Sequence, residues 1–128
     1  MRKEIRVDAL GEPISHYTDA VRFGNLLFCS GVIAVDHDNN LVGGADVAEQ
    51  ARQALTNLGR ILAAVGASFA DVLTVTVYLT DVNDRTKINP VRREFFGETL
   101  PASTLVGIKE LAIPGAKIEI TAVAGISN

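Results

Sequence analysis

The stretch from Leu100 to Ala124 constrains the fold more than any other part of the chain. It contains two strand-like runs of apolar and β-branched residues, over 102–108 and 117–124. Pro114 and Gly115 mark a turn between the two runs. Two apolar strands near the end of a short chain predict a sheet with at least one buried face.

Glu119 lies inside the second run, between Ile118 and Ile120. Strand alternation places it with Thr121 on the face opposite these isoleucines. A carboxylate in a strand this apolar costs free energy unless it is hydrated, paired or used in chemistry. Two interpretations are open. Glu119 lies on a hydrated face of the sheet, or it is a general acid/base that orients a water molecule.

The strongest helical pattern runs from Asp46 to Gly66. Asp46 and Glu49 have the spacing of a capping box, and Gly66 is a typical C-terminal residue. Residues at helical spacing form one apolar stripe: Val47, Ala51, Ala54, Leu58, Leu62 and Val65. Other faces carry the polar residues Glu49, Arg52, Gln53, Asn57 and Arg60. We interpret this helix as scaffold.

Four further strands are predicted. Residues 4–8 alternate apolar and charged groups, and the runs 20–23 and 26–30 flank Gly24-Asn25, which is a two-residue hairpin signal. The strand at 72–79 has two distinct faces. One face is expected to meet the helices: Leu73, Val75, Val77 and Leu79. The other is semi-polar and is expected to face a partner subunit: Thr74, Thr76 and Tyr78.

Asn89 and Pro90 predict the start of a second helix, with Asn89 as the N-cap and Pro90 in the first helical position. The helix has an apolar side and is predicted to end at Gly97. Strands and helices in this order predict an α+β fold with a mixed sheet and two helices on one face.

The composition predicts a single domain over residues 1–128, because 128 residues with 48% hydrophobic side chains suffice for one core. The net charge of -3 disfavours nucleic acid as a partner. The N-terminus does not resemble a signal peptide, and no apolar run is long enough to cross a membrane, so we expect no membrane partner.

The single cysteine, Cys29, favours a cytoplasmic location, where thiols stay reduced. It lies in an apolar run without a patterned histidine, so we expect an inert buried thiol. His16 and His37 are far apart in the sequence, which disfavours a zinc site. We expect no metal and no cofactor.

Several segments, taken together and in order, resemble the RidA/YjgF family of small enamine and imine deaminases, whose members are also described as endoribonuclease L-PSP-like. The segments are Tyr17 before Ala20-Val21, GNLLFCSG at 24–31, EQARQALTNL at 49–58, VTVYLTDVND at 75–84, Asn89 before EFFG at 94–97, and the stretch from Leu100 to Ala124. No single segment is specific, whereas the set is.

The resemblance implies a chorismate-mutase-like fold that closes into a homotrimer around a central barrel, with ligand clefts between subunits. It implies that Glu119 is the catalytic residue. It implies that the substrate-binding residues are Tyr17, Ser30, Gly31, Val32, Asn89, Ser103, Thr104 and Leu105. For some of these a simpler role is also open: Gly31 as a bulge, Asn89 as a helix cap, Tyr17 as a rim aromatic.

The chain departs from the family pattern at three positions. Ser103 stands where the family has a carboxylate-binding Arg, Thr121 where it has a second Glu, and Val32 where a Gln often follows Ser-Gly. Serine offers one neutral donor in place of a charged fork. Three consequences are open. The substrate lacks that carboxylate, or backbone amides near Gly31 and hydroxyl groups hold it, or another cation replaces the Arg. The candidate cations are Lys87, Arg92 and Lys109.

Departures of this kind leave three functional hypotheses. The first is a cofactor-free hydrolytic deaminase of a small imine, enamine or related unsaturated nitrogen metabolite, with altered specificity and with 2-aminomuconate-type substrates included. The second is a trimer that binds a small metabolite without turnover. The third, a ribonuclease or translation inhibitor, is disfavoured by the acidic net charge.

Overall fold

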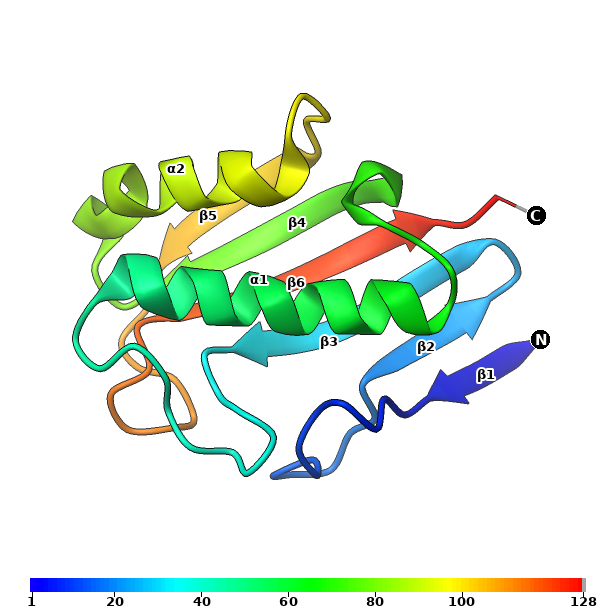
Figure 1. Ribbon diagram of the computed structural model, residues 1–128, viewed down its shortest axis with the longest axis horizontal. Coiled ribbons are helices and arrows are strands. Elements are labelled where there is room, and N and C mark those ends of the chain that lie inside the picture. Colours follow the sequence, from blue (N-terminus) through cyan, green and yellow to red (C-terminus); the bar gives the residue numbers. More distant parts are fainter. Residues whose placement is uncertain (128) are drawn as a thin grey trace.

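The computed structural model describes residues 1–127. Six strands form one mixed sheet, and two helices cover the same face of it (Figure 1). The strands are β1 (Arg2–Ile5), β2 (Ala20–Phe23), β3 (Leu26–Ile33), β4 (Val72–Leu79), β5 (Ala102–Gly107) and β6 (Ile118–Gly125). The helices are α1 (Val47–Ala64) and α2 (Arg85–Phe96), with short 3-10 turns at Phe69–Asp71 and Val82–Asp84.

The strands follow the spatial order β1-β2-β3-β6-β4-β5. All neighbours are antiparallel except β4 and β5, which run parallel and are connected through α2. The two C-terminal strands predicted from the sequence are both present, but they do not pair, because β4 lies between them. A parallel pair needs a crossover connection, and α2 provides it.

Helix α1 begins and ends as the sequence predicts. The Asp46 side chain accepts hydrogen bonds from the amides of Ala48 and Glu49, at 3.0 and 3.3 Å. Gly66 follows the helix with a φ of 74°, a conformation that glycine adopts without strain. The predicted polar faces need one correction. Asn57 is only 4% exposed and points at the sheet.

Helix α2 begins at Arg85, five residues before the predicted first helical position at Pro90. Asn89 is therefore not an N-cap, and Pro90 lies inside the helix. The turn at Val82–Asp84 leads into the helix, and Ile88 is fully buried in its first turn. Burying that side chain offsets the one helical hydrogen bond that Pro90 cannot donate. The predicted end at Gly97 is confirmed.

Strand β4 has the predicted two faces, with one exception. A register shift against β6 between Val72 and Thr74 reverses the alternation at the start of the strand. Val72 is buried in place of Leu73, which is 52% exposed. A bulge of this kind moves one residue to the opposite face. From Val75 onwards the predicted alternation holds.

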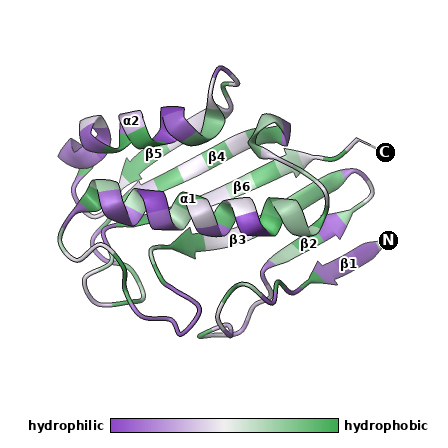
Figure 2. Cartoon of the chain, viewed as in Figure 1, coloured by the Kyte–Doolittle hydropathy of each residue, from purple (hydrophilic) through white to green (hydrophobic). Residues whose placement is uncertain are grey.

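The sheet face that the helices cover carries the core, and the opposite face is uncovered in the single chain (Figure 2). Strand β6 alternates buried and half-buried residues along its whole length. Large apolar side chains stand exposed on the strands, among them Phe28, Leu73 and Val106. Within residues 1–127, neither helix has the length and hydrophobicity of a membrane-spanning segment.

Candidate active site

Glu119 lies on the uncovered face of the sheet, beside an irregularity in the neighbouring strand. Strand β3 contains one extra residue relative to β6, at Ser30-Gly31. The bulge brings this dipeptide against the Glu119 side chain. An open hollow of about 480 Å³ results, and its lining is Ile14, Ser15, Tyr17, Ser30, Gly31, Ile33, Ala112 and Glu119. We refer to it as the Glu119 hollow.

Gly31 makes room for the carboxylate. A Cβ atom at residue 31 would lie 2.5 Å from Oε2 and 2.7 Å from Cδ of Glu119. No side chain larger than hydrogen fits there while the carboxylate keeps its position. Gly31 therefore lies in a β-bulge, as one interpretation predicts, and it also lines the Glu119 hollow.

The Glu119 carboxylate is partly removed from water and unpartnered. Among the described residues it has no hydrogen bond and no ion pair. Burial raises its pKa above the usual range for glutamate. A carboxylate in this state accepts a proton more readily than one in water, and its oxygens are free to receive a donor.

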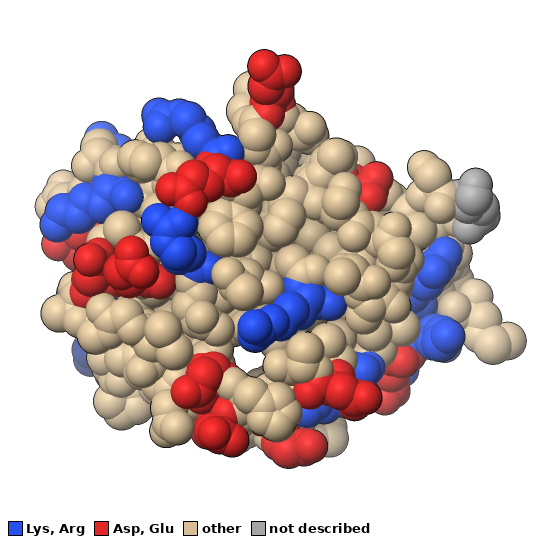
Figure 3. Space-filling model, viewed as in Figure 1, with Lys and Arg blue, Asp and Glu red and all other residues tan. Residues whose placement is uncertain are grey.

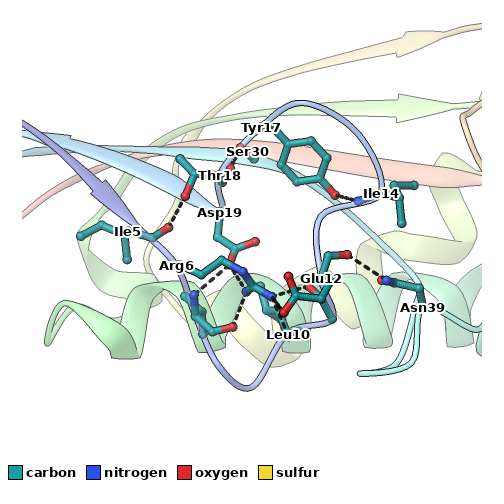
Figure 4. A network of polar contacts seen from close by, with 12 residues as sticks. Ile5, Arg6, Leu10, Glu12, Ile14, Tyr17, Thr18, Asp19, Ser30 and Asn39 are labelled. Atoms are coloured by element: carbon teal, nitrogen blue, oxygen red, sulfur yellow. Dashed lines mark hydrogen bonds and ion pairs between the residues drawn. The ribbon is translucent and has the colours of Figure 1, made fainter.

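Tyr17 and Ser30 both line the Glu119 hollow, and Figure 4 shows the hydrogen bonds that their side chains form. The Tyr17 ring is 46% exposed, and its hydroxyl accepts a hydrogen bond from the Ile14 amide at 3.3 Å. The Ser30 hydroxyl donates to the carbonyl of Thr18 at 2.5 Å. The Ser30 hydroxyl thus connects β3 to the loop between β1 and β2, whereas the Tyr17 hydroxyl forms a bond within that loop.

An ion pair fixes the same loop, and no local sequence signal predicted it. Asp19 is 6% exposed and accepts from Nη1 of Arg6 at 2.5 Å and from the Val7 amide at 2.8 Å. Arg6 also donates to the Gly11 carbonyl at 2.9 Å (Figure 4). The two charges are 13 residues apart in the chain, so only the folded loop brings them together.

Two buried amides of α1 fix the strands that carry the site. Asn57 donates to the carbonyls of Ile33 and Val35, at 3.1 and 2.9 Å, at the end of β3. Gln50 is fully buried, donates to the Gly115 carbonyl at 2.9 Å and accepts from the Lys117 amide at 2.8 Å, just before β6. These residues position Gly31 and Glu119 from behind the sheet.

A second hollow, of about 160 Å³, lies between α2 and the segment that leads into β5. Its lining is Asn89, Arg92, Arg93, Phe96, Gly97, Leu100 and Pro101. We refer to it as the Arg92 hollow. At its edge, Nη2 of Arg92 donates a hydrogen bond to the Ser103 hydroxyl at 2.9 Å. Desolvation lowers the pKa of this guanidinium below its ordinary value.

The predicted site residues therefore form two groups. Ser103 pairs with Val75 on β4 and shares its helix-covered face, whereas Glu119 pairs with Tyr78 on the uncovered face. Three residues along β4 and two strand spacings separate the two positions, which puts their Cα atoms about 14 Å apart. A single chain does not bring Ser103 and Glu119 into one cavity.

The remaining predicted site residues lie apart from both hollows. Thr104 is exposed on β5, one residue along from Ser103 and on the opposite face. Val32 is 6% exposed, and Leu105 packs partly against the core, so neither side chain is available to a ligand. Only their backbone groups remain as candidates for binding.

Cys29 and the histidines show no features of a reactive centre. Cys29 is buried, and desolvation raises its pKa to about 12, so the thiol stays protonated. His16 and His37 are exposed. In the described part of the chain, no three His, Cys, Asp or Glu side chains are placed to hold a metal ion.

Comparison with known proteins identifies the relatives of this chain. The family model described as endoribonuclease L-PSP matches residues 8–126. A RutC family protein of Pyrococcus horikoshii is 40% identical over 97% of this chain and 98% of its own length. The 2-iminobutanoate/2-iminopropanoate deaminase of Bos taurus is 35% identical over 97% of this chain and 90% of its own length.

The fold agrees with the sequence match. The crystal structure of Escherichia coli TdcF with bound serine superposes with a TM-score of 0.89, at 34% identity, over 98% of this chain and 99% of that one. The six-stranded mixed sheet with two helices on one face is the chorismate-mutase-like fold of these proteins. The protein whose residues form these two hollows therefore belongs to the RidA/YjgF family.

Proposed function

We propose that this protein is a cofactor-free hydrolytic deaminase of small imines or enamines, with Glu119 as its catalytic acid/base. One observation carries the proposal. A half-buried carboxylate with no partner among the described residues and a raised pKa faces an open hollow beside Gly31. Functional carboxylates are commonly poised by burial in this way.

The reaction needs one group that first accepts and then returns a proton. The substrate reacts as the protonated imine. Glu119 accepts a proton from water as the water oxygen bonds to the C=N carbon, and the electron pair of the C=N π bond moves to the nitrogen, which becomes a neutral amine. The protonated Glu119 then returns its proton to that nitrogen. The C–N bond breaks, ammonia leaves, and the hydroxyl proton is lost as the carbonyl forms. A pKa raised above the ordinary range of glutamate suits a group that must both accept and return a proton.

The relatives support a small substrate of this class. The bovine relative is named as a deaminase of 2-iminobutanoate and 2-iminopropanoate. The related bacterial structure holds serine. All three are small molecules that carry one carboxylate and one nitrogen group on the adjacent carbon.

We further propose that the complete site forms between copies of the chain in a homotrimer. The Glu119 hollow and the Arg92 hollow lie at different places on one chain. The uncovered sheet face carries Phe28, Leu73 and Val106, and burial of these side chains would stabilise an assembly. Light scattering should give three times the chain mass. A stable monomer at micromolar concentration would contradict the assembly.

Because Ser103 replaces an Arg, we expect the substrate specificity to differ from that of relatives that have the Arg. We include 2-aminomuconate-type compounds among the proposed substrates. The same substitution motivates the alternative function, a trimer that binds a metabolite without turnover. The acidic net charge of -3 argues against RNA as the substrate, although the matching family model is described as an endoribonuclease.

A comparison of Glu119→Gln with wild type separates these functions. Imines are generated in situ from a panel of amines and amino acids, and the release of ammonia is measured. Wild type should accelerate release, and Glu119→Gln should reduce kcat by at least about a hundredfold, as loss of a general base does. Ligand binding without acceleration by wild type would favour the binding trimer.

A further inference from the structure

The Arg92 hollow has the composition of a site for a small anion. Arg92, Arg93 and Asn89 line it, and within residues 1–127 no Asp or Glu does. Neither Arg92 nor Arg93 forms an ion pair with the described residues. Basic side chains gather over α2 (Figure 3), where the acidic neighbour Glu94 is already paired with Arg52 of α1.

Most of the N–H donors of Arg92 have no hydrogen-bond acceptor among the described residues of the single chain. Its side chain is half-buried, and its hydrogen bond among the described residues goes to a neutral acceptor, the Ser103 hydroxyl. Guanidinium has five N–H donors in a planar fork, which matches the two oxygens of a carboxylate. A desolvated cation with free donors is stabilised when an anion binds to it.

We propose that Arg92 binds the carboxylate of the substrate. A cation on α2 then replaces the Arg that the family has on β5, where this chain has Ser103. This inference rests on the proposed function, because it concerns the same assembled cleft. The ligand class is a small molecule with a carboxylate next to the imine carbon. Asn89, which lines the same hollow, would donate a second hydrogen bond.

The positions of Arg92 and Ser103 allow Arg92 to replace the Arg that the family has at residue 103. Nη2 of Arg92 lies 2.9 Å from the Ser103 hydroxyl, so the guanidinium stands at the head of β5. A serine there leaves space for it and holds one edge of the fork. The remaining N–H groups of the fork stay available to a ligand.

The other two candidate cations are less suited to this role. Lys87 is paired with Asp84, at 3.3 Å. Lys109 is exposed in the loop after β5 and is not among the residues that line the Arg92 hollow. Arg92 is therefore the cation that the structure places next to Ser103.

Steady-state kinetics test the inference against a matched control. Arg92→Met keeps the aliphatic part of the side chain and removes the charge. For imines that carry a carboxylate it should raise KM by about tenfold to a hundredfold, with kcat changed less than about threefold. Imines without a carboxylate should be hydrolysed as by wild type. Arg92→Lys should lie between the two, because it keeps the charge and loses the fork.

The control is Arg85→Met, which removes an exposed charge from the same helix at a residue outside the hollow. It should leave both substrate classes unaffected. An Arg92→Met enzyme with an unchanged KM for carboxylated imines overturns the inference. So does a loss of the same size for both substrate classes, since that indicates a structural role. Thermal unfolding of both variants confirms that they are folded.

A binding experiment separates this inference from the proposed function. The probe is 2-oxobutanoate, an unreactive carboxylate, with butanone as its neutral counterpart, and titration calorimetry is the readout. Wild type and Glu119→Gln should bind 2-oxobutanoate alike, whereas Arg92→Met should bind it about tenfold or more weakly. If no variant turns over an imine but this pattern holds, the proposed function fails and the anion site stands. Equal binding by wild type and Arg92→Met overturns the site.

Discussion

The Glu119 carboxylate lies against the Cα of Gly31, close enough that a methyl group there would come within 2.5 Å of Oε2. The contact joins two strands at the point where β3 has its extra residue. The bulge and the glycine together determine where the carboxylate can stand. The position of the proposed acid/base is thus set by the backbone of the neighbouring strand.

Gly31→Ala tests this contact. The clashing atom is the end of a flexible side chain, so the carboxylate can move aside and the protein should remain folded. A displacement of about 1 Å can lower a rate by about a hundredfold, and we expect kcat to fall by tenfold to a hundredfold. Thermal unfolding and imine hydrolysis are the measurements. A folded Gly31→Ala protein with full activity would show that the carboxylate position is unimportant.

The raised pKa of Glu119 has a consequence for activity. The base form is lost as pH falls through this pKa, so kcat/KM should decline on the acidic side at a higher pH than an ordinary glutamate would give. A pH–rate profile between about pH 4 and 8 measures the decline, because this range begins near the ordinary pKa of glutamate and extends well above it. A flat profile over this range would contradict the assignment of Glu119 as the base.

The same shift has a consequence for stability, of opposite sense to that of a salt-bridged carboxylate. The folded state holds the Glu119 proton more tightly than the unfolded state, so the contribution to stability is complete below the unfolded pKa. It is lost as pH rises through the raised folded pKa. Relative to wild type, Glu119→Gln should therefore gain stability as pH rises through this window. Denaturant unfolding at a series of pH values gives the difference.

Gln50 offers a test of the scaffold rather than the chemistry. Gln50→Leu would leave the carbonyls of Gly44 and Gly115 and the amide of Lys117 without a partner. At about 1 kcal/mol for each such group, the free energy of unfolding should fall by about 3 kcal/mol. Glu49→Gln, at an exposed position on the same helix, should change it by less than about 0.5 kcal/mol. Equal effects of the two variants would contradict the bridging role of Gln50.

The family resemblance predicts that Ser103→Arg restores the guanidinium group that binds the substrate carboxylate. Arg92 beside Ser103 alters that expectation, because the new side chain would meet a guanidinium already in place. We expect the single variant to lose stability, by about 1 kcal/mol or more, without a gain in KM for carboxylated imines. The exchange Arg92→Ser with Ser103→Arg should recover both. A single variant that improves KM would indicate room for two cations.

The periodic parts of the fold were predictable from the sequence. Asp46 and Gly66 bound a helix whose apolar stripe is the buried one, and the Gly24-Asn25 hairpin has the expected turn, with a φ of 60° at Gly24. Local rules failed where tertiary contacts override them. Asn89-Pro90 has the chemistry of a helix start, yet Ile88 is buried and extends the helix beyond it.

The face of the sheet on which Glu119 lies was predictable from the sequence, whereas the arrangement of the candidate site residues was not. Strand alternation placed Glu119 on the face opposite Ile118 and Ile120, as observed. Nothing local indicated that Ser103 faces the helices and contacts Arg92, because that depends on the parallel register of β4 and β5. The buried bonds of Gln50 also span a sequence distance, 65 residues to Gly115, that no short pattern covers.

The separation of the two hollows on one chain has a consequence for genetic complementation. In the proposed assembly, Glu119 and Arg92 of any one chain serve different clefts. Glu119→Gln lacks the proposed base, and Arg92→Met binds carboxylated imines weakly. When the two variants are co-expressed, hydrolysis of a carboxylated imine at low concentration would be partly restored, since about a quarter of the clefts in randomly mixed trimers contain both intact halves. Two defective alleles of this gene would complement one another.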